Sequence, residues 1–244
     1  MTNIRLKIQY DGTDYSGWQI QPSDKTIEGE ITVAIGQIFQ REVKLIGASR
    51  TDAGVHARGQ IANFNIDRNV DVQTLRRGLN AILPHDISIQ TAEEVNKDFH
   101  SRYNSKGKVY NYFIWNRDYK TPFYNRYSWH YHPPLDIAEM NRCALFLKGE
   151  KDFSSFRASG CDSSSPIRRI DLFTIKREDG FIKFVVEGSA FMKQMVRNIV
   201  GTLVQVGIGK MKPEQIIEIL EARDRRTAGP TAPAQGLVLV SVKY

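Results

Sequence analysis

The chain has 244 residues and a net charge of +7, and 41% of its residues are hydrophobic. This length can bury one large core or two smaller ones. No apolar run approaches the roughly 20 residues that cross a bilayer, and the N-terminus lacks the charged and apolar regions of a signal peptide. We therefore expect a cytoplasmic protein, and the positive charge favours a polyanionic partner such as a nucleic acid.

The first half of the chain predicts six elements in the order β-α-β-β-α-β. Residues 4–10 alternate between apolar and polar, which is typical of a strand with one buried face. Apolar residues then recur at helical spacing from Ile27 to Ile38, behind Thr26 as a suitable N-cap. The remaining elements are strands at 43–46 and 60–66, a helix at 71–82 with Asp71 as its cap, and a strand at 87–90.

The second half repeats this order in outline. Residues 108–115 predict a strand and residues 136–147 a helix that ends before Gly149. Apolar residues at helical spacing from Met192 to Val206 predict a long helix. The other predicted elements are a hairpin of strands 167–176 and 181–188, a helix that starts near Pro213, and a last strand at 237–242.

Two successive β-α-β-β-α-β units predict an α+β fold. We expect two halves of the split-βαβ, ferredoxin-like type, each with its helices on one face of an antiparallel sheet. The expected halves are residues 1–105 and 106–244. No repeat is visible in the sequence itself, so any duplication concerns the architecture alone.

The stretch from Ser49 to Ala57 carries a possible reactive carboxylate. Arg50 stands two residues before Asp52 and would keep that carboxylate ionised, because a nearby opposite charge favours the charged form. An ionised carboxylate can attack carbon as a nucleophile. Gly54 allows the backbone to turn sharply, and His56 is expected to order the loop. The alternative is an ordinary Arg–Asp ion pair in a turn, and these two residues do not decide between the two readings.

Four further segments favour the reactive carboxylate: Tyr10–Gln19, the Lys-x-Tyr-x-Tyr strand 108–112, Phe191–Gly201 and Asp224–Leu237. Together with 49–57 they resemble the tRNA pseudouridine synthase A family in order and spacing, over nearly the whole chain. The one departure is Ser49, where the family commonly has glycine, and it implies a local adjustment of the backbone.

The resemblance implies an isomerase that converts uridine to pseudouridine at positions 38–40 of the anticodon stem-loop of tRNAs. Asp52 would be the nucleophile, and the sequence leaves open whether it attacks C1′ of the sugar or C6 of the ring. Arg197 would pair with Asp52, and Arg50 could fill the gap that the flipped base leaves in the stack.

Two further residues would contact the target base. Tyr110 would stack on it and take part in removing the proton from C5, and Leu237 would form an apolar wall beneath the uracil. A buried strand tyrosine and ordinary core packing are the alternatives. The N-terminal half would carry the aspartate loop, and the C-terminal half would complete a central active-site cleft that binds RNA.

The resemblance also implies that tRNA is the partner, that the protein acts as a homodimer, and that no cofactor is required. Cys143 and Cys161 lack the spacing of a metal site or a redox motif, so neither a metal nor a disulfide is expected. A non-catalytic RNA-binding protein and a metal-dependent nuclease are the competing classes, and the nuclease lacks clustered carboxylates. Basic pairs and aromatic-rich loops could contact RNA or could simply be solvated surface: Arg76–Arg77, Arg168–Arg169, 223–226 and Tyr124–Tyr131.

Overall fold

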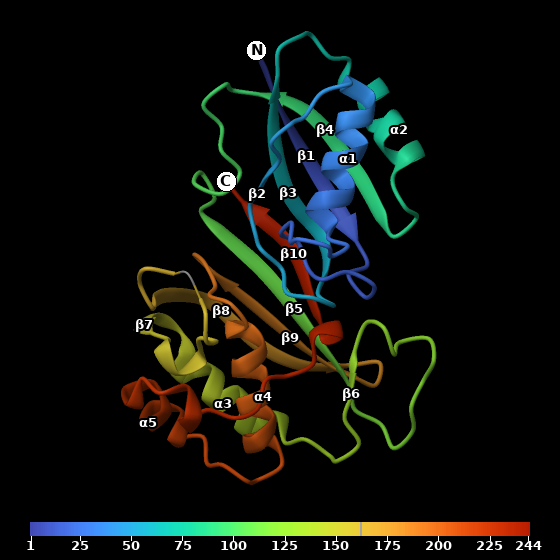
Figure 1. Ribbon diagram of the computed structural model, residues 1–244. Helices are drawn as coiled ribbons and strands as arrows, with labels where there is room; N and C mark the ends of the chain where they lie inside the picture. Colours follow the sequence, from blue (N-terminus) through green and yellow to red (C-terminus); the bar gives the residue numbers. More distant parts are fainter. Residues whose placement is uncertain (162) are drawn as a thin grey trace. The chain divides into compact units, whose positions relative to one another are not determined.

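The computed structural model describes residues 1–161 and 163–244, and these form two compact units (Figure 1). Unit 1 comprises Met1–Lys106 together with Val238–Tyr244, and unit 2 comprises Gly107–Leu237. The last seven residues thus group with unit 1, whereas the sequence placed them in the half 106–244. The reason is a pairing of the last strand with an early one, described next.

The sheet of unit 1 has the strand order β4-β1-β3-β10. β1 (Thr2–Tyr10) runs antiparallel to both β4 (Ile87–Val95) and β3 (His56–Ile66), and the short β2 (Ile46–Gly47) also pairs with β3. β10 (Leu237–Lys243) runs parallel to β3, through the pairs Val238–His56 and Leu239–Ala57. The sheet that was expected to be antiparallel therefore contains one parallel pair.

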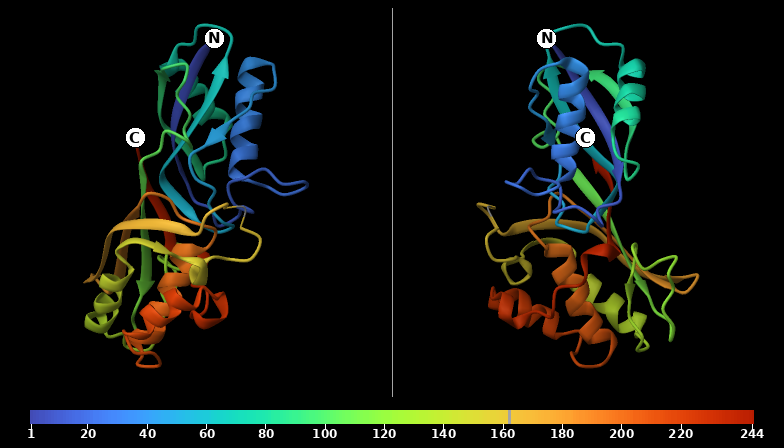
Figure 2. Two further views of the ribbon diagram at one scale, coloured as in Figure 1. Left: turned by 90° about the vertical axis from the view of Figure 1, so that its left-hand side faces the viewer. Right: turned by 45° about the vertical axis from the view of Figure 1, so that its right-hand side comes forward.

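Two helices cover this sheet on the side where the apolar residues of β1 point. α1 (Ile27–Phe39) and α2 (Val72–Ile82) pack against each other, and the left view of Figure 2 shows α1 against one face of the strands. The predicted caps are confirmed, because Thr26 accepts a hydrogen bond from Gly29 N and Asp71 accepts from Gln73 N and Thr74 N. The residues that form this core are fully or nearly fully buried: Ile4, Leu6, Ile8, Ile27, Ile31, Ile35, Phe64, Leu75 and Leu79.

The sheet of unit 2 has the order β5-β9-β8-β7 and is antiparallel along that path. It consists of β5 (Gly107–Trp115), β9 (Phe181–Gly188), β8 (Ile167–Glu178) and β7 (Gly149–Asp152). A two-residue strand, β6 (Trp129–His130), pairs parallel with the end of β5. β6 and β7 were not predicted, because two and four residues are too few to show a period.

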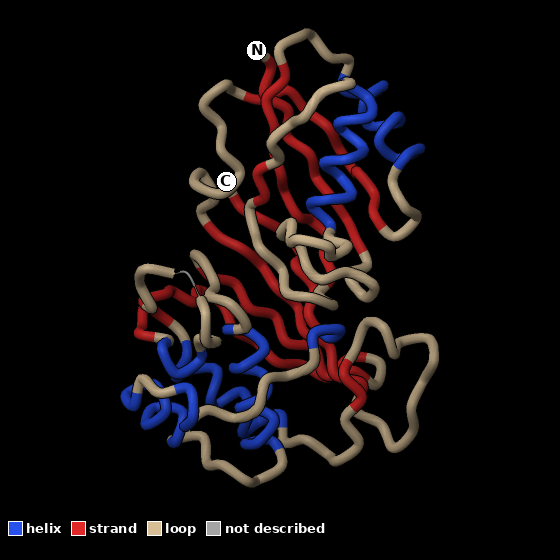
Figure 3. The backbone as a smooth tube through the Cα atoms, in the orientation of Figure 1, coloured by secondary structure: helices blue, strands red, loops and turns tan. Residues whose placement is uncertain are grey.

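The helices of unit 2 are α3 (Ile137–Leu147), α4 (Met195–Gly207) and α5 (Gln215–Ala222), and they gather together beside the strands (Figure 3). α4 is buried over most of its length. It starts at Met195 rather than Met192, because Gln194 adopts a left-handed conformation (φ 59°) directly before it. Short 3-10 turns at 154–156, 225–227 and 234–236 complete the unit.

The predicted α+β class is confirmed, and so is the β-α-β-β-α-β order of the first half. Two strands extend further than expected: β3 begins at His56 rather than Gln60, and β4 continues to Val95. Among the described residues, none of the helices combines the length and hydropathy needed to cross a membrane.

Candidate active site

The loop between β2 and β3 carries Arg50 and Asp52, and Ser49 near its start is held by a buried side chain. Ser49 N donates a hydrogen bond to Gln60 Oε1 (3.2 Å), and Gln60 Nε2 donates to Ser49 O (2.7 Å). Gln60 is fully buried in β3. Both bonds use the backbone of Ser49, so a serine fits here as well as a glycine would.

The middle of the loop is fixed by the last residue of β1 and by the segment that follows it. Tyr10 and Thr51 share a buried hydrogen bond between their hydroxyl groups (2.8 Å), and Trp18 N donates to Thr51 O (3.0 Å). Trp18 is itself almost completely buried. Thr51, the residue directly before Asp52, is therefore held through both its side chain and its carbonyl group.

Two glycines allow that neighbouring segment to approach closely. A Cβ on Gly17, which has φ +97°, would lie 2.7 Å from Thr51 O. A Cβ on Gly12 would lie 2.1 Å from Val55 O. Both distances are far below an ordinary contact, so only glycine allows the two backbones to meet here.

A tight turn presents the carboxylate itself. Val55 N donates to Asp52 O (3.1 Å), and Gly54 adopts a positive φ of 75° within the turn. Asp52 is half-buried, and Arg50 is exposed. The positive charge of Arg50 also acts on α1, where burial raises the pKa of Glu28 and Arg50 opposes that shift.

His56 ends the loop and contacts the segment after β1. Its Nδ1 lies 3.1 Å from Gly12 N and 3.1 Å from Asp11 Oδ1, and the ring is buried. A neutral imidazole accepts from Gly12 N–H at this atom, whereas a protonated one donates to Asp11. In either form His56 ties the end of the aspartate loop to the segment that holds its middle.

In unit 2, the strand β5 places two tyrosines on one face. Tyr110 is buried and meets the ring of Phe191 edge-to-face, with centroids 5.3 Å apart. Tyr112 is fully buried, and its hydroxyl group donates to Pro233 O (2.8 Å). Burial raises the pKa of Tyr112 well above its ordinary value, so this phenol stays protonated and serves packing.

Arg197 projects from α4 and is oriented by the segment that precedes β10. Its Nε donates to Ala232 O (2.8 Å), and its carbonyl oxygen accepts from Ala232 N (3.1 Å). Leu237 is buried at the start of β10. Arg197 and Leu237 are thus held by one stretch of chain, whose Pro233 also receives the Tyr112 hydroxyl bond.

A partly buried polar network holds that stretch against α4. Asn198 Oδ1 accepts from Thr231 Oγ1 (2.6 Å) and from Arg225 Nη2 (3.1 Å). Arg225 Nη1 in turn donates to Gly229 O (2.9 Å). A Cβ on Gly201 would lie 1.7 Å from Pro230 O, so α4 and this stretch touch backbone to backbone.

The family model described as tRNA pseudouridine synthase matches residues 7–104 and 144–244 of the chain. The chain belongs to this family. The matched residues include the segment that follows β1, the loop that carries Asp52, α4 and the C-terminal stretch, whereas β5 with Tyr110 and Tyr112 lies outside them.

Curated members of the family are similar to the chain along its full length. The tRNA pseudouridine synthase A of Acetivibrio thermocellus is 45% identical, that of Thermoanaerobacter sp. (strain X514) 44% and that of Geobacter sulfurreducens 41%, each over 244 residues that cover 100% of both proteins. A chain in the crystal structure of a Cbf5-Nop10-Gar1 complex has a TM-score of 0.39 and 12% identity, over 83% of this chain and 54% of that one. A likeness at that level supports no conclusion here.

The predicted site residues are divided between the two units. Arg50 and Asp52 lie on one loop of unit 1, while Tyr110, Arg197 and Leu237 belong to unit 2. The supporting residues were not singled out from the sequence. Gln60 had a signal, since it is a polar residue inside an apolar strand; Gly12, Gly17, Asn198 and Arg225 act through contacts distant in sequence, which no local pattern reveals.

Proposed function

We propose that this protein isomerises uridine to pseudouridine at positions 38–40 in the anticodon stem-loop of tRNAs, with Asp52 as the nucleophile. The observation that carries the proposal is the fixation of the Asp52 loop. Residues on both sides of Asp52 are held by buried hydrogen bonds and close backbone contacts, so the backbone that carries its carboxylate has a defined position. A preorganised reactive group avoids the entropic cost of ordering it during the reaction.

In the proposed reaction, Asp52 attacks either C1′ of the sugar or C6 of the uracil ring. The bond between C1′ and N1 breaks, the uracil turns over while it is held in place, and C5 forms a bond to C1′. The bond to Asp52 breaks, which releases the carboxylate, and N1 takes up a proton. Loss of the proton from C5 then restores the aromatic ring. Neither the atoms nor the oxidation state of the nucleotide changes, so the reaction requires no redox partner.

The residues of unit 2 would act on the same nucleotide. Arg197 would pair with Asp52, and the hydrogen bond from its Nε to Ala232 O supports a fixed orientation of the guanidinium group. Tyr110 would stack on the base and help remove the C5 proton. Tyr112 is a poorer candidate, since its hydroxyl group is engaged with Pro233 O. Leu237 would form the apolar wall beneath the uracil, and Arg50 would fill the gap in the RNA stack.

Three further parts of the proposal rest on family resemblance. The protein would act as a homodimer, would work in the cytoplasm, and would consist functionally of a half that carries the aspartate and a half that completes the RNA-binding site. The net charge of +7 supports a polyanionic substrate for such an arrangement.

The decisive experiment is incubation of the purified protein with an unmodified tRNA transcript and nothing else, followed by mapping of pseudouridine by chemical labelling. We expect product at positions 38–40 only. A parallel transcript with cytidine at positions 38–40 is the matched control and should give none. Tight tRNA binding without product would favour a non-catalytic RNA-binding protein, and product elsewhere in the tRNA would contradict the proposed site selection.

A further inference from the structure

The segment 116–133, here called the aromatic loop, exposes several large rings. It follows β5, contains β6, and is drawn in green beside the β6 label in Figure 1. Phe123 is 82% exposed, Tyr119 58% and Tyr124 43%. Single exposed apolar residues are ordinary, but several in one segment indicate a surface that binds something.

The base of the aromatic loop is closed by specific bonds. Asn116 Nδ2 donates to both Tyr131 O and Pro133 O, each at 2.8 Å. Trp115 Nε1 donates to Tyr119 O (2.9 Å), and β6 pairs with the end of β5. Both ends of the loop are therefore anchored to the rest of unit 2.

Its outer part is also held in place. The ring of Tyr124 packs on Trp115 and on Phe181, with centroids 5.5 Å and 4.9 Å away. Tyr124 O accepts hydrogen bonds from Ser128 Oγ (2.8 Å) and Tyr127 N (3.0 Å). The residue directly after Phe123 is thus held in place, so the backbone beside the exposed ring needs little ordering when a ligand covers it.

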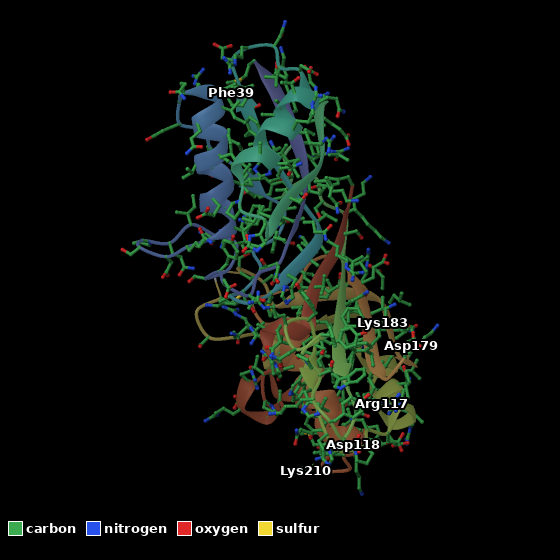
Figure 4. The ribbon with its side chains drawn as sticks, turned by 90° about the vertical axis from the view of Figure 1, so that its right-hand side faces the viewer. Phe39, Arg117, Asp118, Asp179, Lys183 and Lys210 are labelled. Carbon is green, nitrogen blue, oxygen red and sulfur yellow. The ribbon has the colours of Figure 1, made fainter. Side chains whose placement is uncertain are left out.

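Positive charges alternate with these rings along the segment. Arg117, Lys120 and Arg126 stand among the aromatic residues, and Asp118 is the single carboxylate between 116 and 133. Figure 4 shows Arg117 and Asp118 in this part of unit 2. Proteins that bind unpaired nucleic acid stack its bases on aromatic rings and contact its phosphates with cationic side chains.

We infer that the aromatic loop binds unpaired nucleotides of the tRNA, with bases stacked on Phe123 and Tyr119 and neighbouring phosphates on Arg117 and Lys120. This inference rests on the proposed function, because it takes tRNA as the substrate. A second copy of the chain is the less suitable occupant. It would bring the same excess of positive charge to the contact, whereas RNA brings the opposite charge.

The test compares the binding of an unmodified full-length tRNA transcript by the complete chain and its variants, by fluorescence anisotropy over a series of salt concentrations. Phe123→Ala should weaken binding about tenfold at every salt concentration, because a stacking contact involves no counterions. Phe123→Trp retains a ring and should bind within about twofold of the wild type. Lys120→Gln should instead lower the salt slope by about one, as expected for a lost phosphate contact.

Val33→Ala is the matched control, because Val33 is an exposed apolar residue on α1 and should not affect binding. Unchanged affinity in Phe123→Ala would overturn the inference, and so would an equal loss in Phe123→Trp. A change of molar mass in light scattering of Phe123→Ala would identify a contact between chains instead. Pseudouridine formation by the wild type is scored separately: its absence contradicts the proposed function and leaves the binding comparison intact.

Discussion

At the scale of single residues, the candidate nucleophile is defined by its neighbours. Ser49, Thr51 and Val55 each make a backbone hydrogen bond or a close backbone contact, while Asp52 carries the proposed reactive group. A polar substitution at Asp52 should therefore remove chemistry without removing the loop.

Asp52→Asn should lower pseudouridine formation on the order of a thousandfold or more, because an uncharged amide cannot act as the nucleophile. Single-turnover assays with radiolabelled tRNA would measure the rate, and anisotropy would show that tRNA affinity stays within a few-fold. Asp67→Asn, on an exposed carboxylate near the N-terminus, is the control and should keep full activity. Near-normal turnover of Asp52→Asn would remove Asp52 from the nucleophilic role.

A second prediction at this scale concerns the N-cap of α2. The hydrogen bond from the Thr74 side chain, followed by that from Gln73 N, holds the pKa of Asp71 below its ordinary value. A carboxylate with a lowered pKa in the folded state contributes stability at pH values above its unfolded pKa. That contribution is lost as the pH falls through the folded pKa.

The comparison is therefore between the wild type and Asp71→Ala in urea unfolding, at neutral pH and below about pH 3. The variant should have the lower urea midpoint at neutral pH, and the two midpoints should converge in acid. A difference that is independent of pH would show that the charge of Asp71 does not contribute.

At the scale of elements, close contacts between backbones determine how α4 packs against the C-terminal stretch. α4 and the stretch 228–232 meet at Gly201, and this contact places the carbonyl group that orients Arg197. Gly201 in α4 and Gly36 in α1 differ sharply in this respect, since a Cβ on Gly36 would meet its nearest neighbour only at 3.5 Å. They offer a matched pair of substitutions.

Gly201→Ala should destabilise the protein by about 2–3 kcal/mol, because the added methyl group forces backbone apart from backbone. Gly36→Ala should be neutral or stabilising by up to about 1 kcal/mol, because alanine favours the helix and restricts the unfolded chain. Chemical denaturation measures both. Equal stability of the two variants would contradict the close contact at Gly201.

The elements themselves were largely predictable from the sequence. The alternation of apolar and polar residues in 4–10 and the helical spacing of apolar residues behind Thr26 and Asp71 are local patterns. The structure has a strand and two helices at these positions. β6 and β7 were missed because short strands form only when a partner strand is present. For the site, the motifs named the residues, but the supporting roles of Asn198 and Arg225 depend on tertiary contacts that leave no local pattern.

At the scale of the whole molecule, the net charge of +7 is the property that most directly concerns a nucleic acid. If several cations contact phosphates, each releases counterions from the RNA on binding. The logarithm of the binding constant should then fall linearly with the logarithm of the salt concentration.

We expect the affinity for tRNA to fall by about a thousandfold between roughly 50 and 200 mM salt, as for six or more phosphate contacts. Titrations at five salt concentrations would give the slope. Circular dichroism at the same concentrations is the control and should show no unfolding. An affinity that does not depend on salt would exclude phosphate contacts as the main source of binding.

The parallel pairing of β10 with β3 has a consequence for how the chain is made. Residues 1–106 are synthesised long before Val238 and Leu239, and until then His56 and Ala57 lack their neighbours on the β10 side of β3. His56 is also the residue that ties down the aspartate loop. The nascent protein thus cannot complete the pairing of β3 next to the loop of its candidate nucleophile before the final residues emerge. A fragment that ends at Leu237 would leave this edge of β3 unpaired.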